Sequence, residues 1–283
     1  MTTIETFADT ACSLGEGPLW HPLRSQLFWF DINQGTLNTR IGLASQTWHF
    51  KGHVSAAGWV DQDTLLIADE TSLRRFNIST GLSEQVCALE ADNPITRTND
   101  GRADPQGGFW IGTMGKSLEP GAGAIYRYYR GELRRLYAPW TVPNATCFAP
   151  DGGHAYFTDT PTGRIWRQRL NGDGWPSGEP HAFLDLDPAH YRPDGAVIDA
   201  DGRFWCAHYG HAKLTCHGPD GIEQASYALP ARQTTCPAFA GAGSGRLFIT
   251  SAAHNLTEPT KADGTIATLV VDARGQAEHR VVL

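Results

Sequence analysis

The hydrophobic positions of the chain follow a repeat. Six short apolar or aromatic triplets recur, each behind a polar turn such as Asp-Gly-Arg or Asp-Pro-Gln-Gly-Gly. Successive triplets lie 37 to 48 residues apart. Their positions are residues 28–30, 65–67, 109–111, 156–158, 204–206 and 247–249. A period of this length indicates an architecture of repeated supersecondary units.

Each repeat contains about four predicted β-strands. An apolar run precedes the turn and another follows it, as at residues 195–198 and 204–206, which is typical of a β-hairpin. A second pair follows in several copies, as at residues 163–169 and 181–185. A four-stranded unit repeated every ~40–50 residues is typical of a β-propeller. We therefore predict an all-β, six-bladed β-propeller with four antiparallel strands per blade, spanning residues 1–283 as a single domain.

The two ends of the chain are predicted to close the ring. Residues 4–9 precede the first repeat, whereas residues 268–271 and 280–283 follow the last one. Pairing of N- and C-terminal strands in one sheet would close the ring and cover an exposed sheet edge. A large β-sandwich or two smaller β domains are the alternative folds. Neither requires a sixfold regularity, and no Pro/Ser-rich linker divides the chain.

Composition narrows the range of partners. The 31 glycines and 17 prolines, with only 19% charged residues, favour many turns over long surface helices. A net charge of -7 without a run of Lys or Arg argues against nucleic acid and anionic membranes. The N-terminal residues lack the pattern of a targeting signal, and no long apolar run occurs, so we expect a cytoplasmic protein. The six cysteines form no C-x-x-C pair and are expected to be free.

Polar residues recur at one phase of the repeat. Counting back 10 to 12 residues from the triplet gives Glu16, Asn99, Asn144 and Asp194 in the first, third, fourth and fifth copies. The matching regions of the second and sixth copies, residues 53–55 and 235–237, lack carboxylates. Because the innermost strands of a propeller line its channel, we expect the four side chains at one channel mouth. Asn-Asp-Gly and Pro-Asp-Gly are also ordinary turn sequences. Only their shared phase in the repeat distinguishes a common site from a set of unrelated turns.

Carboxylates that converge away from water repel one another unless a positive charge compensates them. Oxygen ligands from Glu16, Asn144 and Asp194 would suit one divalent cation of the hard class, namely Ca²⁺, Mg²⁺ or Mn²⁺, with Zn²⁺ or Fe(II) left open. A zinc cluster elsewhere is a weaker interpretation, because its residues lack a recognised zinc-finger spacing. The residues of that alternative are Cys206, His208, His211, Cys216 and His217.

At these positions the chain resembles the regucalcin (senescence marker protein 30)/gluconolactonase/LRE-like family over nearly its whole length. The segments that carry the resemblance are residues 14–20, 97–114, 148–160, 193–195, 199–202 and 247–252. The resemblance implies a six-bladed propeller with one divalent metal ion bound by Glu16, Asn144 and Asp194. It also implies substrate contacts from Arg97, Asn99 and Glu119. One departure is Ala145-Thr146, where the family usually has Gly-Leu or Gly-Ile after the asparagine.

The resemblance implies hydrolysis of a sugar lactone to the sugar acid. In that reaction a metal-polarised carbonyl would be attacked by a metal-bound water, with Asp194 as the general base. Arg97, Asn99 and Glu119 would orient the hydroxyls of an uncharged aldonolactone. The alternatives are a phosphotriesterase-like hydrolase on the same scaffold and a non-catalytic metal-binding or recognition propeller. We expect a monomer or weak homo-oligomer, and the sequence does not select a lactone or ring size.

Overall fold

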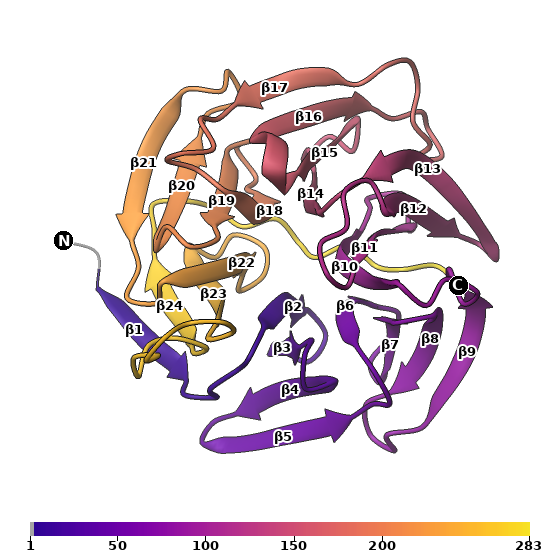
Figure 1. Cartoon of the computed structure of the whole chain (residues 1–283), viewed down its shortest axis with the longest axis horizontal. Helices are drawn as coiled ribbons and strands as arrows, with labels where there is room; N and C mark the ends of the chain where they lie inside the picture. Colours follow the sequence, from indigo (N-terminus) through magenta and orange to yellow (C-terminus); the bar gives the residue numbers. More distant parts are fainter. Residues whose placement is uncertain (1–2) are drawn as a thin grey trace.

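Six four-stranded antiparallel sheets form a ring around a central channel (Figure 1). The computed structural model describes residues 3–283. Met1 and Thr2 lie outside that range. They belong to the N-terminal segment that lacks the sequence pattern of a targeting signal. From the innermost strand outward, the first three blades are β2 (Gly15–His21), β3 (Gln26–Asp31), β4 (Thr36–Ile41) and β5 (Ala44–His49); β6 (Val54–Trp59), β7 (Thr64–Asp69), β8 (Ser72–Asn77) and β9 (Ser83–Ala88); and β10 (Thr96–Ala103), β11 (Phe109–Gly115), β12 (Gly123–Tyr129) and β13 (Glu132–Trp140).

The other three blades follow the same order. They are β14 (Pro143–Phe148), β15 (His154–Asp159), β16 (Arg164–Arg169) and β17 (His181–Asp185); β18 (Pro193–Ile198), β19 (Phe204–His208), β20 (Lys213–His217) and β21 (Glu223–Ala228); and β22 (Gln233–Phe239), β23 (Arg246–Ala252), β24 (Ile266–Val270) and β1 (Ile4–Ala8). A 3₁₀ turn, η1 (Thr160–Thr162), joins β15 to β16. The predicted six-bladed all-β architecture is confirmed.

The repeated triplets form the second strand of every blade. Trp29, Trp110 and Trp205, at the centre of three of them, are at most 2% exposed. A strand that is second from the channel has neighbours on both edges and on both faces, which explains why its apolar residues run consecutively instead of alternating with polar ones. The six cysteines are free, as predicted. Residues 3–283 include no helix with the length and apolar character needed to cross a membrane.

The ring closes through β1, which pairs antiparallel with β24, so that Ile4 lies opposite Leu269. This pairing confirms the predicted closure by the two ends of the chain. The part of the prediction that assigned residues 280–283 to the closing sheet is wrong. Those residues belong to a C-terminal strap, residues 271–283, that leaves the sixth blade and crosses beneath the ring (Figure 1).

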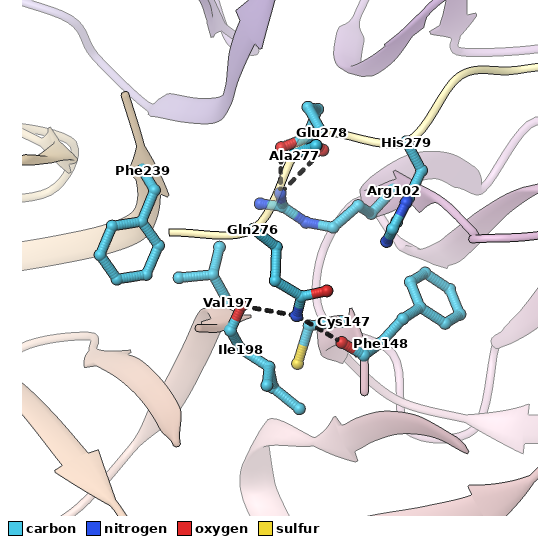
Figure 2. A pocket seen from close by; sticks show the side chains of 10 residues that line it. All are labelled: Arg102, Cys147, Phe148, Val197, Ile198, Phe239, Gln276, Ala277, Glu278 and His279. Atoms are coloured by element: carbon cyan, nitrogen blue, oxygen red, sulfur yellow. Dashed lines mark hydrogen bonds and ion pairs between the residues drawn. The ribbon is translucent and has the colours of Figure 1, made fainter. Parts of the chain in front are cut away.

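The C-terminal strap covers the end of the channel at which the innermost strands finish. Its Gln276 amide donates to the carbonyls of Phe148 and Ile198, at the last residues of β14 and β18 (Figure 2). Glu278 accepts two hydrogen bonds from Arg102, at 2.9 and 3.0 Å. The strap therefore closes the far mouth and leaves the near mouth, where the innermost strands begin, as the accessible one.

Candidate metal centre and active site

The innermost strand of every blade changes register near its first residues. In β2 the irregularity falls between Glu16 and Leu19, and in β14 between Asn144 and Cys147. Matching shifts occur in β6, β10, β18 and β22. Such a β-bulge breaks the alternation of side chains and re-aims them. The phase found in the sequence is thus the position of a bulge at the near mouth of the channel.

Glu16, Asn144 and Asp194 meet at this mouth. Their exposed fractions are 8%, 4% and 5%, and all three line one cavity of about 490 Å³. Arg97 and Asn99, from β10, line the same cavity. The structure therefore brings together five of the six residues that the sequence analysis selected.

A hydrogen-bond relay fixes the amides of this cluster. Arg97 Nη1 donates to Asn99 Oδ1 at 3.0 Å, and Asn99 Nδ2 donates to Asn144 Oδ1 at 2.7 Å. Asn144 Nδ2 donates in turn to Thr160 Oγ1 at 2.9 Å, and that hydroxyl donates to the carbonyl of Pro193 at 2.7 Å. Both ends of the Asn144 amide are held, so the direction of its oxygen is set before any ligand arrives.

The carboxylates of the cluster are held in an unfavourable environment. Burial, and then the charge of Asp100, raises the pKa of Glu16 to about 8. Burial, and then the charges of Glu16 and Asp100, raises the pKa of Asp194 well above its usual value. Arg97 is close enough to interact with both, but burial lowers its own pKa to about 10. A site with two crowded carboxylates and an oriented amide oxygen has the donor set of a hard divalent cation, whose charge would compensate the repulsion.

The alternative zinc cluster is not formed. Within residues 3–283, no three His, Cys, Asp or Glu side chains are grouped as a metal site would require. His208 Nε2 instead contacts Thr215 Oγ1 at 2.8 Å, and the Cys206 thiol donates to the Ala207 carbonyl. A site made of two carboxylates and one asparagine contains only two side chains of those four types, so it is compatible with this finding.

Glu119 is the one selected residue outside the cavity lining. Its Oε2 atom accepts a hydrogen bond of 3.0 Å from the backbone N–H of Ser117, within the same loop. Lys116, Ser117 and Leu118 of that loop do line the cavity. The loop is thus part of the site wall, while the Glu119 carboxylate is turned toward its own backbone.

Several cavity-lining residues were missed by the sequence analysis. Arg192 lies directly before the Pro-Asp-Gly motif, and its guanidinium lies over the Tyr209 ring, 5.3 Å from the ring centre. His53 occupies the selected phase in the second repeat. Neither side chain carries an oxygen that could bind a hard cation, which was the property sought at this phase of the repeat. The position of His53 in the repeat would have identified it if histidine had also been considered.

Comparisons with known proteins agree with this geometry. The SMP-30/gluconolactonase/LRE-like region matches residues 14–253. A Rhizobium meliloti (strain 1021) protein provisionally named a sugar lactone lactonase is 36% identical over 96% of this chain and 95% of its own length. The L-arabinolactonase of Azospirillum brasilense is 34% identical over 90% of this chain and 86% of its own.

The fold has a near counterpart among solved structures. The crystal structure of a calcium-binding protein, regucalcin, from Agrobacterium tumefaciens str. C58 aligns with a TM-score of 0.96 and 33% identity, covering 100% of this chain and 98% of the other. The family match, which spans most of the chain, and the relatives above 30% identity lead to one conclusion. This chain belongs to the SMP-30/gluconolactonase/LRE-like family.

Proposed function

We propose that this protein is a metal-dependent lactonase that hydrolyses a sugar lactone of the aldonolactone class to the sugar acid. The observation that carries the proposal is the convergence of Glu16, Asn144 and Asp194 on one polar cavity at the open channel mouth. The names of the relatives, a sugar lactone lactonase and an L-arabinolactonase, support the same chemistry. The similarity to regucalcin, a calcium-binding protein, supports a divalent cation.

Glu16, Asn144 and Asp194 would hold the cation. When bound, it supplies Lewis-acid polarisation of the lactone carbonyl and of water. Asp194 is the residue we assign to take a proton from the attacking water, because its carboxylate has a second oxygen and faces the cavity from β18. Asn99 holds the Asn144 amide through the 2.7 Å hydrogen bond and so keeps the ligand oriented.

The cavity lining favours a polyol ring over an apolar ester. Arg97 uses Nη1 for Asn99 and the Thr98 carbonyl, which leaves its other guanidinium N–H groups for substrate hydroxyls. Asn33, Gln233 and Asn255 add amide groups from the first and sixth blades. An organophosphate would need a mostly hydrophobic pocket. A contact from Glu119 to substrate stays a prediction, and it requires the carboxylate to leave the Ser117 N–H.

The test is acid release from five- and six-carbon aldonolactones. Hydrolysis should stop with a chelator and return with one divalent cation. Asp194→Asn, with its metal content measured, should lower kcat by about 10²-fold or more. Asp187→Asn is the matched control, because that side chain is 62% exposed and outside the cavity. Undiminished hydrolysis by metal-loaded Asp194→Asn would remove the base assignment. An inactive wild-type protein with metal bound would favour a binding function.

A further inference from the structure

His53 and Glu70 form a partly buried pair at the wall of the same cavity. His53 directly precedes β6 and lines the cavity. Its Nδ1 atom lies 2.5 Å from Glu70 Oε2, and its side chain is 30% exposed. The other ring nitrogen, Nε2, makes no hydrogen bond to any residue of the described chain. The ring is thus held at one nitrogen and free at the other.

Glu70 is itself held from three directions. Its second oxygen, Oε1, forms an ion pair with Lys116 Nζ, which comes from the third blade. The backbone N–H of His53 approaches Oε2 at 3.4 Å. Gly52, with a φ of +89°, allows this approach, since a Cβ there would lie 3.3 Å from Glu70 Oε2. A carboxylate fixed in this way sets the orientation of the imidazole.

This arrangement suits proton transfer. A histidine whose Nδ1 is held by a carboxylate presents Nε2 as a general acid or base, which is the geometry found in nucleophile-activating triads. Lactone hydrolysis requires a proton for the ring oxygen as it departs, and the residues assigned above do not provide one. His53 directly precedes β6 in the second blade and Asp194 lies in β18 of the fifth. In a ring of six blades the second and fifth are opposite, and β6 and β18 lie on opposite sides of the channel (Figure 1).

We propose that His53, positioned by Glu70, donates the proton to the departing ring oxygen; this rests on the proposed lactonase function. The water oxygen bonds to the carbonyl carbon while Asp194 takes a water proton. The bond from that carbon to the ring oxygen then breaks, and the ring oxygen keeps the electron pair and receives the proton of His53 Nε2. Asp194 then releases the water proton to solvent, His53 regains a proton from solvent, and the product acid ionises. One water is consumed per lactone.

The experiment compares an oxygen lactone with the thiolactone of the same sugar acid. A thiolate with a pKa near 8.5 leaves without a proton, whereas an alkoxide does not. His53→Gln should therefore lower kcat on the lactone by about 10²–10³-fold and on the thiolactone by less than about tenfold. His190→Gln is the control, because it makes the same change at a side chain that is 74% exposed.

Three further measurements sharpen the test. Added imidazole should restore part of the lactone activity of His53→Gly, and metal content should match the wild type in every variant. Glu70→Gln should lower kcat on the lactone by about tenfold or more and leave kcat on the thiolactone nearly unchanged, a difference that a merely structural role of Glu70 would not produce.

The outcomes separate the two proposals. A wild-type protein that hydrolyses no lactone overturns the proposed function and this role with it. Lactone hydrolysis by the wild type combined with an unchanged kcat for His53→Gln, or with a rise in KM alone, overturns the proton-donor role only. Equal losses on lactone and thiolactone would also overturn it, because they would point to misfolding or misplaced substrate.

Discussion

Ala145, at a position where the family resemblance leads us to expect glycine, adopts a backbone conformation that favours glycine. The residue has a φ of +58°, in the left-handed region, so the backbone keeps the path that glycine would take. For an alanine this costs about 1–2 kcal/mol. The methyl group is fully buried in the core cluster that includes Cys147 and Ala196. Its burial offsets part of the free-energy cost of the left-handed conformation. The amide of the adjacent Asn144 makes hydrogen bonds at both its oxygen and its nitrogen.

This balance predicts a small effect for one variant and a large loss of stability for another. Ala145→Gly should change the free energy of unfolding by less than about 1 kcal/mol, because relief of strain offsets the lost methyl and the added flexibility of the unfolded chain. Ala145→Val should lower it by about 2–4 kcal/mol, because β-branched residues avoid positive φ. Urea unfolding measures both. If the valine variant were as stable as the glycine variant, the positive φ of residue 145 would not restrict the side chain at this position.

At the residue scale, the sequence was sufficient to predict which side chains converge at the channel mouth. Glu16, Asn99, Asn144 and Asp194 share a position in the repeat, and a repeat fixes relative position around a ring without any knowledge of distances. Glu119 lies on a loop, and a loop sequence does not specify where its side chain turns. Whether these residues bind metal or substrate stays a prediction.

At the scale of elements, the strands were predictable and the C-terminal strap was not. Residues 280–283 have the apolar pattern of a strand, but periodicity does not identify a partner. The strap instead donates Val281 N–H to the Trp59 carbonyl, and the Val281 side chain is buried with Phe109. Gly58 permits this contact, since a Cβ there would lie 2.4 Å from Val281 Cγ2. These contacts join residues more than 150 positions apart, which local patterning cannot report.

The strap should contribute measurably to stability through one ion pair. Arg102 and Glu278 are only 12% and 11% exposed, so removing one charge leaves the other desolvated and without its ion-pair partner. Glu278→Gln should lower the free energy of unfolding by about 2–4 kcal/mol. Glu132→Gln, which breaks an ion pair with both side chains about half exposed, should cost less than about 0.5 kcal/mol. Urea unfolding measures both variants. If they lowered the free energy of unfolding equally, the Arg102–Glu278 pair would stabilise the fold no more than an exposed ion pair does.

At the scale of the whole molecule, dense packing around the ring shields several histidines wholly or partly from solvent. Burial lowers the pKa of His208 to about 3, and it also lowers the pKa of His21, His217 and His279. Unfolded histidines titrate near 6.5. Below that pH the unfolded chain binds protons that the folded chain does not, so the free energy of unfolding falls as the pH drops from about 6.5 toward 3.

His208 allows this pH dependence to be isolated. Its Nε2 atom contacts Thr215 at 2.8 Å, so His208→Gln can keep a hydrogen bond while removing the titration. Between about pH 7 and about pH 5, the wild type should lose about 1–2 kcal/mol more stability than His208→Gln. Urea unfolding at the two pH values gives this difference directly, and protonation of other groups cancels in it. Parallel losses in the two proteins would mean that His208 is protonated in the folded ring, which would require water or an anion beside a side chain that is fully buried in this structure.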